Sequence, residues 1–254
     1  MKKIKEKSSG FGDNLGWLIL YLVLLSVCTI PMTMSGAIEA FTNGYGKPIE
    51  ALERAGNFFN VYGILISFVL MLIMFFVVIK KKKEALLLDV KNFNSNRKKN
   101  TLLTIAGFLF LIGFNFLLTD VIRPHLFTSV TTENQANLVS IISKSTPIYS
   151  LILYLLLLVI IIPIFEEIFC RFNFRKSFKS TIVFIIVTSL IFGILHMSSF
   201  SLSFEFFYDL FIYVFMGVCL AYVYCKTESI CSSIIMHILN NLVSVFMLIL
   251  PFLK

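Results

Sequence analysis

The chain has 254 residues, of which 58% are hydrophobic and only 14% are charged, with a mean hydropathy of +0.90 and a net charge of +8. Soluble domains contain about 25% charged residues, so this composition excludes an ordinary soluble protein and indicates a polytopic membrane protein. The cations cluster in short segments beside apolar runs, where such residues set membrane orientation and contact anionic headgroups. We therefore predict membrane lipids, and no nucleic acid, as partners.

Seven apolar segments each approach the roughly 20 residues that are needed to cross the hydrocarbon core of a bilayer. In chain order, the predicted spans are Leu15–Ser35, Phe58–Ile79, Leu102–Val121, Ile148–Phe165, Thr181–Met197, Phe204–Tyr224 and Ser229–Leu250. The fourth span is expected to continue as helix toward Lys176. The sequence therefore predicts an all-α, polytopic transmembrane helical bundle of about seven spans.

The cations also predict how the bundle is oriented. Residues 1–7, 80–100 and 171–180, together with Lys226, hold most of the 22 Lys and Arg residues, and they fall on one side if the spans alternate. By the positive-inside rule that side is cytoplasmic. We predict a multi-pass protein of the plasma membrane whose N-terminus is in the cytoplasm.

One polar stretch, residues 133–147, is too short and too polar to span the bilayer. Leu138, Val139, Ile141 and Ile142 give it one apolar face. This pattern predicts a helix that lies in the membrane interface.

Three polar clusters interrupt the apolar segments of the C-terminal half. They are Glu166 and Glu167 with Arg171, then His196, then His237 with Asn241. Ionisable side chains at such depth are costly, so they usually face the bundle interior and mark a functional site. Glu166 and His196 are nearly equidistant from the turn near Lys179, and the seventh span enters from the same side. We therefore expect the three clusters to meet at one level in the bundle.

The spacing of these residues suggests separate roles for the two glutamates. Glu167 and Arg171 are four residues apart and can pair on one helix face, whereas Glu166 points about 100° away, toward the histidines. A carboxylate can take a proton from water and return it to a leaving amine, and an imidazole can orient the water or stabilise an oxyanion. Equally, Glu166, His196 and His237 could hold zinc with an open water position. The residues alone leave both mechanisms open.

The three clusters resemble the motifs of a known membrane-protein family. Glu-Glu-x-x-x-Arg at residues 166–171 resembles the first motif of the CPBP family, Phe-x-x-x-His at Phe192 and His196 its second, and His-x-x-x-Asn at His237 and Asn241 its third. That family comprises type II CAAX prenyl endopeptidases and bacteriocin-processing or immunity proteins, also called Abi. The resemblance covers roughly residues 135–245, with the order and spacing of the motifs intact.

The resemblance implies an intramembrane endopeptidase that cleaves a membrane-associated peptide or protein in a cavity open to the cytoplasm. It implies that Glu166 activates water with the help of His196, that His237 and Asn241 form the oxyanion site, and that Glu167, Arg171 and Phe192 support them. No cofactor is then required, with zinc as the alternative. Residues 133–250 would be the catalytic helical core, and residues 1–125 a transmembrane scaffold.

The sequence departs from the family at the end of the first motif. The family usually has an aromatic residue followed by Arg-Gly, whereas here Cys170 precedes Arg171 and Phe172 follows it. We expect this difference to affect substrate fit more than the catalytic acids.

Two other functions are consistent with the same residues. The first is a catalytically silent bacteriocin-immunity or regulatory membrane protein of the same fold. The second is a small proton-coupled transporter, because buried acids and histidines also form proton relays. The compactness of the polar cluster and the lack of an inverted repeat argue against the transporter. His237 and Asn241 could instead have a purely structural role, as hydrogen-bonding groups between helices. The structural role of Phe192 would be packing.

Overall fold

The computed structural model describes residues 11–44, 50–129, 131–132, 135–136, 139, 148–197 and 200–250. All regular structure in these residues is helical, which confirms the predicted all-α class. The helices are α1 (Phe11–Gly44), α2 (Glu50–Ser95), α3 (Arg97–Phe116), η1 (Leu117–Ile122), α4 (Arg123–Leu126), α6 (Ile148–Leu156), η2 (Leu157–Ile161), α7 (Ile162–Glu167), η3 (Ile168–Phe172), η4 (Arg175–Ser177), α8 (Thr181–Leu195), α9 (Phe204–Thr227) and α10 (Ile230–Ile249).

Six of the predicted spans correspond to helices that are long and apolar enough to cross a membrane. The remaining predicted span, Thr181–Met197, corresponds to α8. This helix is apolar but has only 15 residues, or about 22 Å of helix at 1.5 Å per residue. It ends at Leu195, and His196 is its C-cap residue. The chain is therefore a multi-pass membrane protein with one short apolar helix among its spans. The predicted interfacial helix at 133–147 lies almost entirely outside the described residues.

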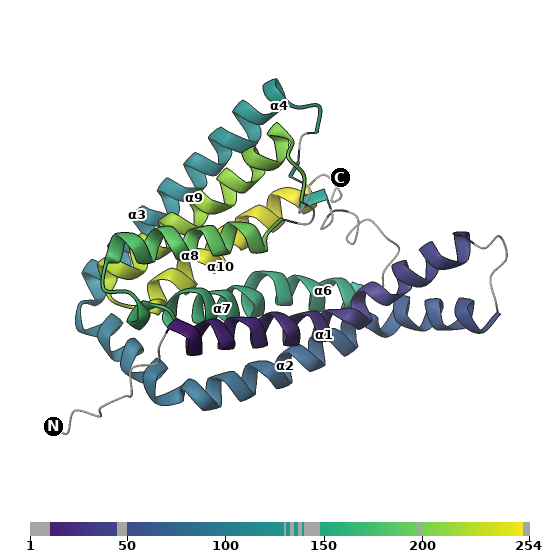
Figure 1. The fold of residues 1–254 in the computed structure, drawn as a ribbon, viewed down its shortest axis with the longest axis horizontal. Helices are drawn as coiled ribbons and strands as arrows, with labels where there is room; N and C mark the ends of the chain where they lie inside the picture. Colours follow the sequence, from purple (N-terminus) through teal and green to yellow (C-terminus); the bar gives the residue numbers. More distant parts are fainter. Residues whose placement is uncertain are drawn as a thin grey trace.

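The helices form two groups with α10 between them (Figure 1). Helices α1 and α2 pack along each other, and α6 packs on α2. On the other side, α9 packs on α8 and α3. Helix α10 contacts α2, α3, α7 and α9, so its side chains reach both groups. A polar residue on α10 is therefore well placed to join polar residues from several other helices.

Aromatic packing holds α7 and the following η3 turn against the first two helices. Tyr21 of α1 stacks on Phe169 with a centroid separation of 4.5 Å, and Phe75 of α2 meets Phe165 edge-on at 5.9 Å. Such pairs contribute about 0.5–1.5 kcal/mol each beyond the area that they bury. Because Phe165 is fully buried in this cluster, the next residue, Glu166, is turned about 100° away from it.

Two π-helical turns flank α7. The segment η2 (Leu157–Ile161) precedes it, and η3 (Ile168–Phe172) comes after it. A π-turn adds one residue to a helix and rotates the downstream residues by about 100° relative to an uninterrupted α-helix. The direction of the side chains on the six-residue α7 therefore depends on both turns, and such turns are frequent at functional sites.

The first two helices meet at a close crossing. A Cβ atom on Gly63 of α2 would lie 2.3 Å from the Pro31 carbonyl oxygen of α1, so only glycine allows the approach. One turn along α2, the buried Ser67 hydroxyl accepts a hydrogen bond from the Met32 N–H at 3.2 Å. The crossing therefore combines backbone contact with a polar contact.

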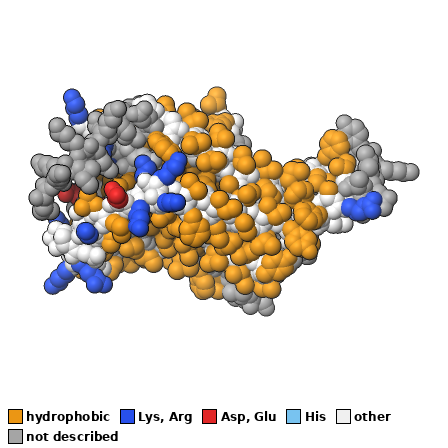
Figure 2. Space-filling model, turned by 90° about the horizontal axis from the view of Figure 1, so that it is seen from below, with side chains coloured by type: hydrophobic (Ala, Val, Ile, Leu, Met, Phe, Trp, Pro, Cys, Tyr) orange, Lys and Arg blue, Asp and Glu red, His pale blue; other side chains and the backbone are white. Residues whose placement is uncertain are grey.

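Basic side chains gather at one end of a largely hydrophobic surface, the end where α2 meets α3 (Figure 2). One acid from this segment, Asp89, is buried instead. Its carboxylate accepts hydrogen bonds from Ser229 Oγ at 2.7 Å, the Ile230 N–H at 2.9 Å and the Cys231 N–H at 3.2 Å. These N–H groups belong to the first turn of α10, where a helix lacks internal acceptors and favours negative charge. Helix α2 therefore caps α10.

Candidate active site

Three side chains from three helices meet in the interior. Glu166 lies near the end of α7, His196 at the C-cap of α8, and His237 in the middle of α10. Glu166 Oε1 is 3.9 Å from His196 Nε2, and Glu166 Oε2 is 3.6 Å from His237 Nε2. His237 is fully buried, whereas the Glu166 and His196 side chains are 14% and 16% exposed. Glu166 and His196 are close enough to bind one water molecule jointly, and both remain accessible.

The hydrogen bonds of the two imidazoles determine which nitrogen faces Glu166. His196 Nδ1 lies 2.9 Å from the Phe192 carbonyl oxygen, which can only accept, so Nδ1 donates. His237 Nδ1 lies 3.0 Å from Glu167 Oε1 and likewise donates to a carboxylate. In both neutral rings the lone pair is then on Nε2. Both lone pairs are therefore directed to the side of the imidazole that faces Glu166.

Glu167 is the centre of a buried hydrogen-bond network. Its carboxylate pairs with Arg171, as expected from their spacing, and it also accepts from Ser233 Oγ and from His237. Glu166 lies near both histidines and Glu167 pairs with Arg171, as expected; the sequence did not predict that His237 also contacts Glu167. Sequence reasoning missed Ser233, although it precedes His237 by four residues and so shares its helix face.

Aromatic rings enclose His196. Phe192 packs against it with a centroid separation of 4.2 Å and lies 5.5 Å from the His237 ring. The Arg171 guanidinium lies 4.3 Å above the Phe192 ring, which favours a cation–π contact. Tyr213 of α9 stacks on His196 at 4.9 Å. The sequence contained no signal for Tyr213, because α9 has many aromatic residues at every face.

Asn241 lies one helical turn beyond His237, and its amide bonds to a neighbouring helix. Asn241 Nδ2 donates to the Leu158 carbonyl oxygen at 3.0 Å, inside η2. On its other side, Asn240 Nδ2 donates to Asn241 Oδ1 at 3.3 Å, and Asn115 of α3 donates to Asn240 at 3.2 Å. The structure therefore places Asn241 in a chain of amides that links α3, α10 and η2.

The zinc alternative requires several ligands that meet at one place. Among the residues that the structure describes, no three His, Cys, Asp or Glu side chains are placed to hold a metal ion. Glu166, His196 and His237 are the set that the sequence suggested for zinc, and their role in binding it stays a prediction. The chemistry that these side chains can perform by themselves is proton transfer to and from a shared water molecule.

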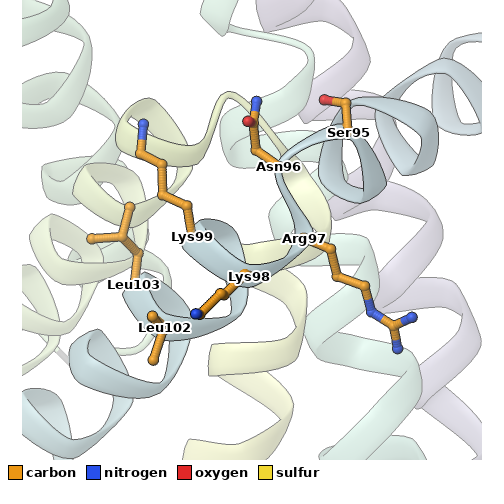
Figure 3. Close-up of a pocket in the computed structure, with 7 residues that line it drawn as sticks. All are labelled: Ser95, Asn96, Arg97, Lys98, Lys99, Leu102 and Leu103. Atoms are coloured by element: carbon orange, nitrogen blue, oxygen red, sulfur yellow. The ribbon is translucent and has the colours of Figure 1, made fainter.

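A pocket of about 600 Å³ lies elsewhere, at the turn between α2 and α3 (Figure 3). Its lining consists of Ser95, Asn96, Arg97, Lys98, Lys99, Leu102 and Leu103. It contains none of the predicted site residues, and its three consecutive cations belong to the basic end of the molecule.

The comparison with known families agrees with the motifs. Residues 148–243 match the family model of the Rce1-like type II CAAX prenyl endopeptidases, a type that the CPBP resemblance includes. No curated protein and no solved structure matches the chain significantly. The matched segment begins with α6 and ends inside α10, so it contains all three motifs. The division of the chain into parts at 125 and 133 stays a prediction. In this multi-pass membrane protein, the segment of residues 148–243 is therefore similar to the Rce1-like type II CAAX prenyl endopeptidases.

Proposed function

We propose that the protein is an intramembrane endopeptidase in which Glu166 activates the attacking water. The observation that carries this proposal is the Glu166 carboxylate within 4 Å of two imidazole nitrogens that come from different helices. A partly exposed carboxylate in such a position can hold, orient and deprotonate a single water molecule.

The reaction begins when the water oxygen attacks the peptide carbonyl carbon while Glu166 takes one of its protons. His196 Nε2 accepts a hydrogen bond from the second O–H of the water and so orients the attack. Glu166 then returns its proton to the amide nitrogen as the C–N bond breaks. The same group thus serves first as general base and then as general acid.

His237 stabilises the oxyanion of the tetrahedral intermediate. It does so in its doubly protonated form, in which Nε2 also carries a proton; this proton is bound before the water attacks and stays on the ring throughout the step. The Glu167 carboxylate at Nδ1 stabilises the positive charge of that form. An oriented donor of this kind is the usual way in which enzymes stabilise a developing oxyanion.

The substrate is a membrane-associated peptide or protein, because the site is buried between helices of a membrane bundle. We place the protein in the plasma membrane, surrounded by lipids, with the basic end and the opening of the site toward the cytoplasm. This orientation is the one that the positive-inside rule predicts.

Purified protein in proteoliposomes, incubated with a library of membrane-bound peptides, tests the activity. Glu166→Gln keeps the shape of the side chain but cannot accept the proton, so we expect cleavage to fall at least about 100-fold. The exposed Glu84 of α2 supplies a matched control, and Glu84→Gln should cleave at the wild-type rate.

Full cleavage by Glu166→Gln would contradict the proposal. Loss of wild-type cleavage with a chelator, restored by zinc, would contradict the metal-free mechanism. No cleavage by the wild type, combined with protection of cells against a bacteriocin that survives in Glu166→Gln, would identify a catalytically silent immunity protein.

A further inference from the structure

The helix that carries Glu166 has a proline where the π-turn calls for a backbone donor. In η2 the hydrogen bonds skip five residues, and the Ile162 N–H donates to the Leu157 carbonyl. In that register the next carbonyl, that of Leu158, would accept from residue 163. Residue 163 is proline, which has no N–H.

The Asn241 side chain supplies the missing donor. Its Nδ2 donates to the Leu158 carbonyl oxygen at 3.0 Å. A backbone carbonyl without a partner is unfavourable inside a membrane bundle, where water cannot replace the missing donor, so a π-turn followed by proline needs such an external donor. The amide oxygen of Asn241 is in turn held by Asn240. The Asn241 amide is therefore fixed in this orientation from both ends.

We propose that Asn241 is a positioning residue that maintains the π-turn before Pro163 and thereby aims Glu166 at the two histidines. This inference rests on the proposed function of Glu166. Glu166 lies three residues after Pro163, within one turn of the bonded segment. If the extra residue of the π-turn were lost, α7 would rotate by about 100° relative to α6, and the Glu166 carboxylate would leave the imidazoles.

This role differs from that of an oxyanion donor, although both involve the same amide group. An oxyanion donor acts on the substrate, and no change in another helix can replace it. A donor to the Leu158 carbonyl can be replaced by a backbone N–H at residue 163. The two roles therefore predict different outcomes for a double substitution.

The test is a double-substitution cycle in the full-length protein, with kcat and KM measured in proteoliposomes. Asn241→Ala should lower kcat about 10- to 100-fold, as expected for a misaligned catalytic group, with KM changed less than about threefold. Pro163→Ala restores an N–H beside the Leu158 carbonyl. In the Asn241→Ala/Pro163→Ala protein, kcat should recover at least about fivefold over Asn241→Ala alone.

Two further variants control for indirect effects. Pro163→Gly also provides an N–H and should rescue Asn241→Ala, whereas Pro31→Ala, which changes the proline inside α1, should not. Because a variant could fail to fold, each is compared by membrane expression and thermal unfolding, and any rescue must appear in kcat for proteins of equal folded fraction.

The inference is overturned if Asn241→Ala cleaves at the wild-type rate, or if neither Pro163 substitution raises the kcat of Asn241→Ala. The Glu166→Gln protein separates this result from a failure of the proposed function. If Glu166→Gln is inactive and no rescue occurs, only the role of Asn241 is wrong. If Glu166→Gln is fully active, the proposed function itself is wrong.

Discussion

The two adjacent glutamates are chemically identical but lie in different surroundings. Glu166 is partly exposed and faces two imidazole Nε2 atoms. Glu167 is fully buried and contacts Arg171, Ser233 and His237. A partly exposed acid can exchange a proton with water, whereas a buried acid bonded to three groups holds its neighbours in place. The division of labour between the pair therefore depends on which way each side chain points.

This difference predicts opposite effects of the same substitution at the two positions. Glu167→Gln removes the charge that balances buried Arg171, and breaking a buried ion pair in this way costs about 3–5 kcal/mol. Glu166→Gln leaves the Arg171 pair intact and should leave stability nearly unchanged. Thermal unfolding of both purified variants in one detergent measures the contrast. A Glu167→Gln protein as stable as Glu166→Gln would contradict the structural role of Glu167.

At the scale of elements, contacts from helices outside the matched residues 148–243 determine the position of α10. Asp89 of α2 bonds the first turn of α10, two turns before His237. Asn115 of α3 reaches Asn240 on the same helix. The N-terminal helices thus hold the position of a site residue although they contribute none to the site themselves.

Asp89→Ala should destabilise the protein by about 1–3 kcal/mol, because it removes a buried, charged acceptor from three donors at a helix N-terminus. It should also lower cleavage activity, because His237 lies on the released helix. Asp89→Asn keeps one acceptor oxygen and should lose less. The exposed Asp120 offers a control, and Asp120→Ala should match the wild type in thermal unfolding and in activity. An Asp89→Ala protein with wild-type stability would show that the cap does not hold α10.

At the scale of the whole molecule, the charge distribution determines how the bundle lies in the membrane. The α2–α3 turn is at the basic end, and α4 lies at the far end of the helix that α3 and η1 form from this turn (Figure 1). Positive charge is retained on the cytoplasmic side during insertion. The site residues would then be accessible from the cytoplasm.

Single cysteines at the two ends test this orientation in intact cells. Thr128→Cys lies just after α4 and Lys98→Cys lies at the start of α3, and both positions are exposed. A membrane-impermeant maleimide should label Thr128→Cys in intact cells and Lys98→Cys only after the cells are permeabilised. The wild type, whose five cysteines are buried or partly buried, gives the background. The reverse pattern would invert the proposed topology.

Several features of the site could be predicted from single residues, and others could not. The positions of Glu166, His196 and His237 stand out because polar residues contrast with apolar helices. The π-turn at 157–161 cannot be recognised in the sequence. Every residue from Leu155 to Ile162 is apolar, so no polar residue indicates how the helix is rotated. The contacts of Glu167 with His237 and of Asn241 with the Leu158 carbonyl depend on that rotation of the helix. Residues of the candidate site could therefore be predicted from the sequence, but most of their contacts could not.

The sequence by itself determined that the chain is a helical membrane protein with polar groups at three places in its C-terminal half. Length, hydropathy and charge are sums over residues, so they can be obtained without knowing how the helices pack. Only the tertiary structure decided which acid faces the histidines, which imidazole nitrogen carries the lone pair, and what the Asn241 amide bonds. Those facts depend on helix rotation and on contacts between residues as far apart as 83 positions, as for Asn241 and Leu158. Packing against neighbouring helices determines rotation and depth, and no local pattern in the chain encodes it.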